Sequence, residues 1–148
     1  MASLKIWISA FRLRTLPLAL SATILGSFLA YDMHSFKWSV LILGMITTLF
    51  LQILSNLAND YGDAQKGTDN EHRIGPQRLT QAGIVTRREI RGMIFLFIVL
   101  SLLAGSALIY FGMRGTGSYL YLLFFVLGIT AIVAAIKYTV GKRPYGYT

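Results

Sequence analysis

Hydrophobic residues in this chain fall into four long blocks, none of which contains a charged side chain. The blocks cover residues 15–31, 38–59, 92–113 and 115–136; the first is 17 residues long and the others are 22. A helix needs about 20 residues to cross the hydrocarbon core of a bilayer, and lipid offers no partners to the free backbone groups of a strand. The pattern therefore predicts an all-α fold, a polytopic transmembrane helical bundle with four spans, in which residues 1–148 form one membrane domain or part of one.

Local signals at the ends of these blocks also favour helices. Pro17 falls in the first turn of the first block, where a missing N–H costs little. Thr86 and Glu89 have the spacing of a capping box, in which each side chain bonds the other residue's backbone N–H, so the third helix should begin here. Gly67 offers a stop for the second helix.

The basic residues are distributed unevenly along the chain. There are 14 Lys and Arg against six Asp and Glu, a net charge of +8. Twelve of the 14 lie before the first block, in the loop over about 60–91, or after the fourth block, and only Lys37 and Arg114 lie in the other two connections. By the positive-inside rule, the N-terminus, the 60–91 loop and the C-terminus should be cytoplasmic, as in a multi-pass protein of the cytoplasmic (inner) membrane. Because topology explains most of the basic charge, we expect no nucleic acid partner.

A cluster of acidic and amide residues follows the second block. Five of the six acidic residues lie in the 60–91 loop. If the second helix continues past residue 59, four polar side chains share one face about 100° wide. They are Asn56, Asn59, Asp60 and Asp63. A single Asp at the end of a span often marks only the water boundary, but four polar residues in phase at the edge of a bilayer favour a functional site.

The chemistry of these residues favours a metal ion. Carboxylates this close repel one another unless a cation lies between them. An all-oxygen set of Asp and Asn suits Mg²⁺, which keeps several waters and shares phosphate oxygens with a substrate. Asp69 would join the set if the chain folds back after Gly67. Arg73 and Arg78, in the same loop, could neutralise the carboxylates, and together with Mg²⁺ they indicate a diphosphate site. The chain has no cysteine, which excludes thiolate nucleophiles and cysteine-ligated zinc.

Four segments, in order along the chain, resemble the UbiA-type intramembrane prenyltransferase superfamily. Its first aspartate-rich motif has the form Asn-Asp-x-x-Asp, matched here by residues 59–63. Over its whole length the chain is most similar to the menaquinone-pathway branch, the 1,4-dihydroxy-2-naphthoate polyprenyltransferases. The matching segments are WISAFRLRTLP, NLANDYGDAQKGTD, RIGPQRLTQAGIV and KYTVGKRPYGYT.

The chain departs from the superfamily pattern in two respects. The general pattern has an Asp eight residues after the motif Asn, where this chain has Gly67, and Asp69 stands two residues later. The menaquinone branch shares that shift, which favours it over the hydroxybenzoate prenyltransferases. The family also has about nine spans and a second aspartate-rich loop, whereas this chain has room for four spans. It resembles the N-terminal half alone, so we expect a fragment that is inactive by itself.

The resemblance implies a reaction and its participants. In the family, an allylic polyprenyl diphosphate binds through Mg²⁺ to the two aspartate-rich motifs, its C–O bond breaks to give an allylic cation, and an electron-rich aromatic acceptor attacks that cation. In the menaquinone branch the acceptor is 1,4-dihydroxy-2-naphthoate, and loss of its carboxylate gives demethylmenaquinone. An apolar chamber between helices in the lipid bilayer would hold the prenyl tail and exclude water.

The resemblance also assigns roles to the matched positions. Asp60 and Asp63 are expected to be both catalytic and metal-binding. The other metal-binding candidates are Asn56, Asn59 and Asp69. The diphosphate-binding candidates are Arg73, Arg78, Lys142 and Arg143. The positive-inside rule alone would also place basic residues on this side of the membrane.

Three other interpretations remain open from the sequence. A prenyltransferase of another aromatic acceptor would carry the same first motif. A small cation transporter or channel subunit would also need acidic residues, but such proteins place them near the middle of a span, where this chain has none. A membrane scaffold without enzymatic activity would have no use for four aligned polar side chains.

Overall fold

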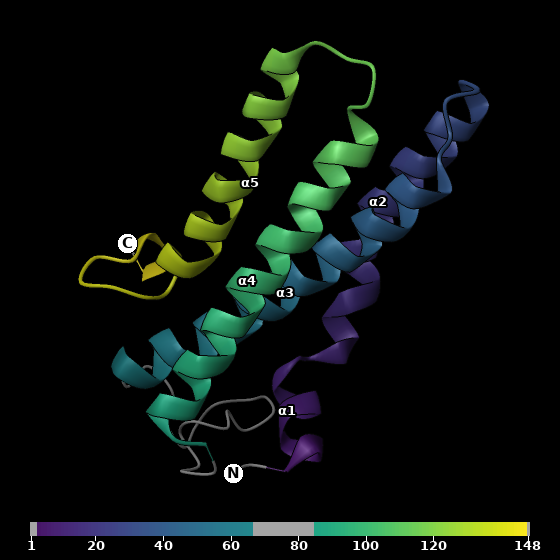
Figure 1. Cartoon of the computed structure of the whole chain (residues 1–148). Helices are drawn as coiled ribbons and strands as arrows, with labels where there is room; N and C mark the ends of the chain where they lie inside the picture. The colour runs from purple at the N-terminus through teal and green to yellow at the C-terminus, as the bar shows by residue number, and fades with distance from the viewer. Residues whose placement is uncertain (1–2, 67–84, 148) are drawn as a thin grey trace.

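The computed structural model describes residues 3–66 and 85–147, and these form helices joined by short connections (Figure 1). In chain order the elements are α1 (Leu4–Ala10), η1 (Leu13–Thr15), α2 (Leu16–Asp32), α3 (Trp38–Lys66), α4 (Arg87–Gly112), α5 (Ser118–Lys137) and η2 (Tyr145–Tyr147). Within these described ranges, four helical stretches are long and apolar enough to cross a membrane, with α1 and α2 counted together as one. The expected all-α, polytopic membrane fold is confirmed, and the described residues include no strand.

The helix α3 extends well past the uncharged block from which it was predicted. Its 29 residues correspond to about 43 Å of helix, against a hydrocarbon core of about 30 Å. The segment from Asp60 to Lys66 therefore continues the helix beyond the length that a bilayer requires. The polar residues at this end therefore lie on a rigid helix and not on a loop. This agrees with the assumption, made in phasing them, that the helix continues past residue 59.

The boundaries of α4 and α5 follow from local backbone chemistry. At the start of α4, the Thr86 hydroxyl accepts from the Glu89 N–H at 3.2 Å, and the Thr86 N–H donates to a Glu89 carboxylate oxygen at 2.9 Å. The predicted capping box is therefore present. The helix α5 begins at Ser118, because Gly115 has a φ of 88° and Gly117 is extended. Pro17 lies in the first turn of α2, as predicted.

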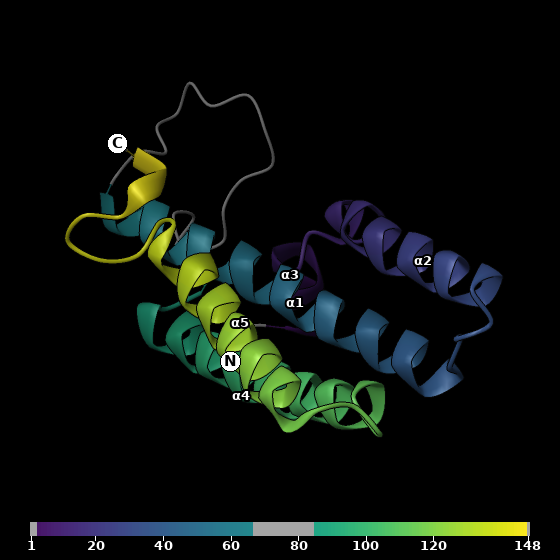
Figure 2. The same ribbon diagram turned by 90° about the horizontal axis from the view of Figure 1, so that it is seen from above.

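The helix α3 is the central element of the bundle. It lies between α2 on one side and the α4–α5 pair on the other, and its most extensive contact is with α4 (Figures 1 and 2). The core includes Leu54 and Leu57, which are fully buried on α3, and Ile90 on α4. The Phe97 ring of α4 makes edge-to-face contacts with Phe11, at 5.4 Å between centroids, and with Phe50, at 5.8 Å. These contacts join the N-terminal segment, α3 and α4.

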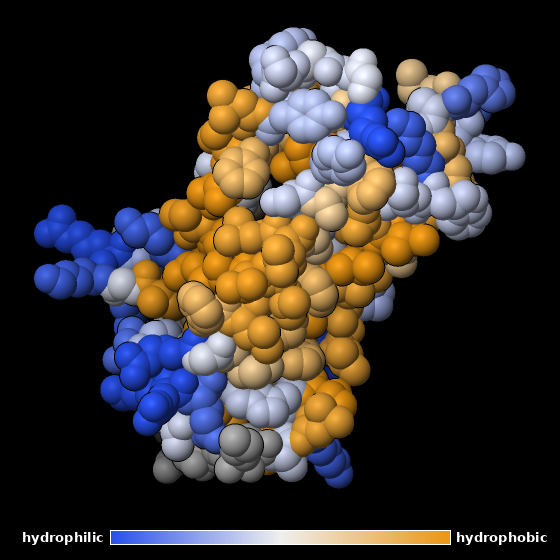
Figure 3. Space-filling view, viewed as in Figure 1, coloured by the Kyte–Doolittle hydropathy of each residue, from blue (hydrophilic) through white to orange (hydrophobic). Residues whose placement is uncertain are grey.

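The outer helices expose most of their apolar surface. No residue of α2 is buried, and Ile132 is the buried residue of α5. On the face shown in Figure 3, an apolar band covers the middle of the molecule and polar groups gather above and below it. An apolar band of this kind suits contact with lipid or with further helices.

The chain reverses direction at each connection, so alternate connections lie at the same end of the bundle. The start of α1, the end of α3 and the start of α4 lie at the lower end in Figure 1, and α5 runs back toward it. The α2–α3 and α4–α5 connections lie at the opposite end. The described parts of the three basic segments therefore lie at one end of the molecule.

Candidate metal and diphosphate site

The polar face at the end of α3 points into the protein. Asn56, Asp60 and Asp63 are 4%, 3% and 6% exposed, and Asn59 is half-buried. The three buried residues lie on successive turns of one helix, as the phase argument predicted. Buried carboxylates need a cation or hydrogen-bond donors to offset the loss of hydration, so the surroundings of this face decide what it can bind.

One cation at this face comes from the N-terminal segment. An Nη2 hydrogen of Arg12 is donated to Oδ1 of Asp60, across 48 positions of sequence. Arg12 has a left-handed backbone with a φ of 52°, which is uncommon for a residue with a side chain. Thr15 fixes this turn, because both its backbone N–H and its hydroxyl donate to the Arg12 carbonyl at 2.9 Å. The turn directs a guanidinium toward the first Asp of the motif.

Asn56 anchors the same turn from the side of α3. Its Nδ2 group donates to the Phe11 carbonyl at 3.0 Å and to the Thr15 hydroxyl at 3.2 Å. Its Oδ1 accepts from Gln52 at 3.4 Å. The side chain of this predicted metal-binding residue is thus engaged in holding the N-terminal turn beside Asp60.

The C-terminal end of the chain meets the opposite side of the motif. The Thr139 hydroxyl lies 3.0 Å from both the Ala58 carbonyl oxygen and Oδ1 of Asn59, and it donates its one proton between them. Thr139 is buried, and its backbone lies directly against Gly62. A Cβ atom at position 62 would come within 2.4 Å of the Thr139 carbonyl oxygen. The motif therefore tolerates this approach because its fourth residue is glycine.

Residues 138–147 form a closed loop after α5, which we call the C-terminal loop. The Gly146 N–H donates to the Tyr138 carbonyl at 2.8 Å and joins the two ends of the loop. The Tyr145 hydroxyl donates to the Ala134 carbonyl of α5 at 2.6 Å. Lys66 at the end of α3 places its Nζ 4.4 Å from the centre of the Tyr147 ring. The loop is thus attached both to α5 and to the end of α3.

Comparison with known proteins identifies the family to which this arrangement belongs. Residues 19–147 match the UbiA prenyltransferase family. The chain belongs to that family. No solved structure gives a significant match.

Several curated relatives are named 1,4-dihydroxy-2-naphthoate octaprenyltransferase. The one from Escherichia coli (strain K12) is 46% identical over 141 residues, which cover 95% of this chain and 45% of the relative. The one from Haemophilus influenzae is 47% identical over 146 residues, covering 97% of this chain and 47% of the relative. The one from Mycobacterium leprae is 36% identical over 147 residues. The chain spans about half the length of the curated relatives that it matches.

The residues at the end of α3 can supply some of the ligands of a divalent-cation site in a UbiA-family chain. Asp60 and Asp63 supply carboxylate oxygens one turn apart, and Mg²⁺ typically needs only one or two protein carboxylates when substrate phosphates and water complete its shell. Among the described residues, no three carboxylate, His or Cys side chains converge on one point. The donor set of this segment therefore fits a hard cation shared with a phosphate ligand, and it does not form a closed protein cage.

The structure describes only two of the five remaining candidate residues, which are Asp69, Arg73, Arg78, Lys142 and Arg143. Lys142 and Arg143 are exposed on the C-terminal loop, at the end of the bundle that carries the aspartates. Asp69, Arg73 and Arg78 lie outside the described residues.

Sequence reasoning missed three residues at this site, namely Arg12, Gly62 and Thr139. All three lie within segments that resemble the family, and that resemblance was a usable signal for Arg12. Nothing in the local sequence indicated that Thr139 would meet Asn59, 80 residues away.

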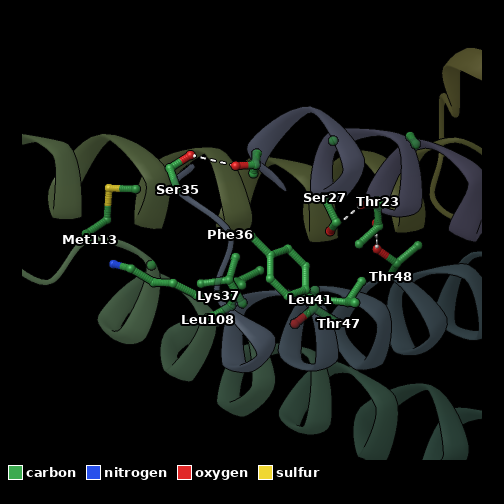
Figure 4. A pocket seen from close by; sticks show the side chains of 16 residues that line it. Thr23, Ser27, Ser35, Phe36, Lys37, Leu41, Thr47, Thr48, Leu108 and Met113 are labelled. Carbon is green, nitrogen blue, oxygen red and sulfur yellow. Dashed lines mark hydrogen bonds between the residues drawn. The ribbon is translucent and has the colours of Figure 1, made fainter. Parts of the chain in front are cut away.

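A pocket of about 580 Å³ lies between α2, α3 and the end of α4, away from the aspartates (Figure 4). Its hydroxyl groups are already bonded: Thr23 and Thr48 lie 3.0 Å apart across α2 and α3, and Ser27 donates to the Thr23 carbonyl. The one charged side chain in its lining is Lys37. With its polar groups paired internally, this pocket offers little chemistry of its own.

Proposed function

We propose that this chain supplies part of the active site of a Mg²⁺-dependent polyprenyltransferase that transfers an allylic prenyl group to 1,4-dihydroxy-2-naphthoate with decarboxylation, giving demethylmenaquinol, the hydroquinone form of demethylmenaquinone. The observation that carries the proposal is the buried, in-phase pair Asp60 and Asp63 at the end of α3 in a chain of this family. The acceptor is the one in the names of two relatives that are 46% and 47% identical to this chain.

The proposed reaction breaks the C–O bond between the allylic carbon and the diphosphate. The diphosphate leaves with the bonding electron pair, and the ring carbon of the naphthoate that bears the carboxylate attacks the allylic carbon. Carbon dioxide then departs and returns its bonding electrons to the ring. A bound Mg²⁺ would stabilise the negative charge on the leaving diphosphate.

The residues of this chain would act mainly by binding and orientation. Asp60 and Asp63 would hold the metal, with Asn59 as a further oxygen donor or as an orienting group. Arg12, Lys142 and Arg143 would offset the charge of the diphosphate from two sides of α3, since cations aimed at developing charge lower the barrier to its formation. Asp69, Arg73 and Arg78, which lie outside the described residues, would belong to the same side of the site.

We also propose that the aspartate-bearing end of the bundle faces the cytoplasm of a cell with a cytoplasmic (inner) membrane. The three basic segments support this orientation through the positive-inside rule. The diphosphate donor would enter from that side, while its apolar tail would lie in the bilayer.

The test is a chimera with the Escherichia coli relative. The matched 141 residues of that relative are replaced by this chain, and membranes are assayed for prenyl transfer from octaprenyl diphosphate to 1,4-dihydroxy-2-naphthoate. We expect Mg²⁺-dependent product from the chimera. We expect Asp60→Asn or Asp63→Asn to lower its rate by at least about 100-fold, because each removes a charge that holds the metal.

The outcomes separate this proposal from its alternatives. Near wild-type turnover in either Asn variant would falsify the metal role of that aspartate. An active chimera that prefers hydroxybenzoate would indicate another acceptor. Cation flux through liposomes containing the purified chain would favour the transporter, although the described acids Asp60 and Asp63 lie at one end of the bundle rather than at mid-span.

A further inference from the structure

The contact between α3 and the C-terminal loop runs along one stripe of α3. Ala58, Gly62 and Lys66 are each four residues apart and lie on one face of the helix. Ala58 offers its carbonyl to Thr139, Gly62 receives the Thr139 backbone, and Lys66 covers Tyr147. The loop therefore follows α3 for two turns beside the aspartate motif.

The contact at Gly62 is too close for any other residue. A Cβ atom there would lie 2.4 Å from the carbonyl oxygen and 2.6 Å from the carbonyl carbon of Thr139. Both are backbone atoms, so no side-chain rotation relieves the overlap. By contrast, a Cβ atom at Gly92 on α4 would meet nothing within 4 Å. The backbone of the C-terminal loop thus packs directly against α3 at Gly62.

The hydroxyl of Thr139 adds a second contact between the C-terminal loop and α3. It reaches both the Ala58 carbonyl and the side chain of Asn59, and Thr139 is only 5% exposed. A buried hydrogen bond of this kind restricts the rotamer of Asn59, whose Oδ1 is the atom that would reach a cation. The same contact fixes where the loop that bears Lys142 and Arg143 leaves α5.

We propose that Thr139 and Gly62 form a joint that positions Asn59 and the basic C-terminal loop relative to Asp60 and Asp63. The joint rests on the proposed function, because it sets the register between metal-binding oxygens and diphosphate-binding cations. Thr139 is a positioning residue: it acts through Asn59 and the loop and does not itself touch the substrate.

A distance measurement tests the joint without metal or substrate. The chain has no cysteine, so Gln65→Cys and Lys142→Cys give one spin-label pair on exposed positions of the 148-residue chain in detergent. We expect a narrow distance distribution for the parent and for Thr139→Ser, which keeps the hydroxyl. We expect a broad one for the isosteric Thr139→Val and for Gly62→Ala. Gly92→Ala is the matched control and should leave the distribution narrow.

Metal binding by the unlabelled chimera with the Escherichia coli relative tests the positioning of Asn59, because this chain carries only part of the proposed metal site. Mn²⁺ is titrated in the presence of inorganic pyrophosphate and followed by electron paramagnetic resonance. Thr139→Val should weaken Mn²⁺ binding by about tenfold and Thr139→Ser by less than about twofold, as for other groups that orient metal ligands. The thermal unfolding midpoint of each variant is recorded so that a loss of fold is recognised.

Each outcome decides one part of the proposal. Equal behaviour of the Val and Ser variants overturns the role of the hydroxyl. Broadened distances with unchanged Mn²⁺ affinity overturn the positioning of Asn59 while keeping the joint. If the parent binds no Mn²⁺, or if Asp60→Asn leaves its Mn²⁺ affinity unchanged, the metal part of the proposed function fails. The distance measurement still tests the contact between Thr139 and Gly62 independently.

Discussion

At the scale of single residues, the buried negative charge of Asp60 is balanced by a specific positively charged partner. Asp60 is 3% exposed on α3, so its charge requires a partner. In the structure Arg12 is such a partner, presented by a turn with a left-handed residue that Asn56 and Thr15 hold in place. A divalent cation bound at Asp60 would take over part of this task. Arg12 and a metal ion are therefore alternative or joint partners of one carboxylate.

This balance predicts the effect of removing Arg12. Arg12→Gln should destabilise the metal-free chain by about 1–3 kcal/mol, because it removes a hydrogen bond to a buried charged group. Mg²⁺ should recover more stability in this variant than in the parent, because its Asp60 is left with fewer donors. Unfolding in detergent with and without Mg²⁺ measures both effects.

Arg14 provides the matched control for Arg12. It lies two positions further on, is exposed, and has the same charge. Arg14→Gln should change neither the stability nor the response to Mg²⁺ by a measurable amount. Equal effects of the two substitutions would show that net charge, and not the contact with Asp60, is responsible.

At the scale of elements, the extra length of α3 carries the polar face of the site, and a capping box fixes where α4 begins. The uncharged part of α3 is already long enough to span a bilayer, so the polar end continues on the same rigid axis. The start of α4 is defined by the capping box of Thr86 and Glu89, which satisfies N–H groups that the first turn of a helix leaves free. Ile90, fully buried in the next turn, then packs into the core.

The capping box gives a prediction for α4. Thr86→Ala should cost about 1 kcal/mol of stability and speed hydrogen exchange at the amides of the first turn of α4, because the Glu89 N–H loses its acceptor. Hydrogen exchange measured by mass spectrometry on the purified chain detects the local opening.

Thr130→Ala is a suitable control for the cap. The Thr130 hydroxyl is exposed on α5 and donates to the carbonyl of its own helix at Val126, 2.8 Å away. Its removal leaves no backbone N–H unsatisfied, so exchange should stay as in the parent. Unchanged exchange at the start of α4 in Thr86→Ala would contradict the capping role.

At the scale of the whole molecule, the reversals of the chain place the described parts of the three basic segments at one end. The reversals themselves follow from the four apolar stretches and short outer connections. We expect charge to set the orientation of this end with respect to the membrane, since 12 of 14 basic residues belong to these segments. The site at the end of α3 should accordingly face the cytoplasm.

Single cysteines test this orientation, because the chain has none of its own. In intact cells, Ser35→Cys and Thr116→Cys in the outer connections should react with a membrane-impermeant maleimide. Ser3→Cys and Lys142→Cys should react only after permeabilisation, which also serves as the control for accessibility. The reverse pattern would place the aspartates on the outer side and contradict the proposed topology.

Periodic local features explain why much of the fold was predictable. Four uncharged blocks predicted four long helices, and Thr86 with Glu89 predicted where α4 begins. The phase of Asn56, Asp60 and Asp63 predicted their common face, because helical geometry relates residues three and four apart without reference to the rest of the chain.

What the sequence by itself determined was everything that depends on neighbours along one helix: the spans, the cap and the polar face of α3. The tertiary structure alone decided which distant groups meet that face, namely Arg12 at Asp60 and Thr139 at Gly62 and Asn59. The physical reason is that these contacts join residues 48 to 80 positions apart. These contacts depend on how the helices pack. The sequence around a single glycine or threonine does not indicate which distant residue it will contact.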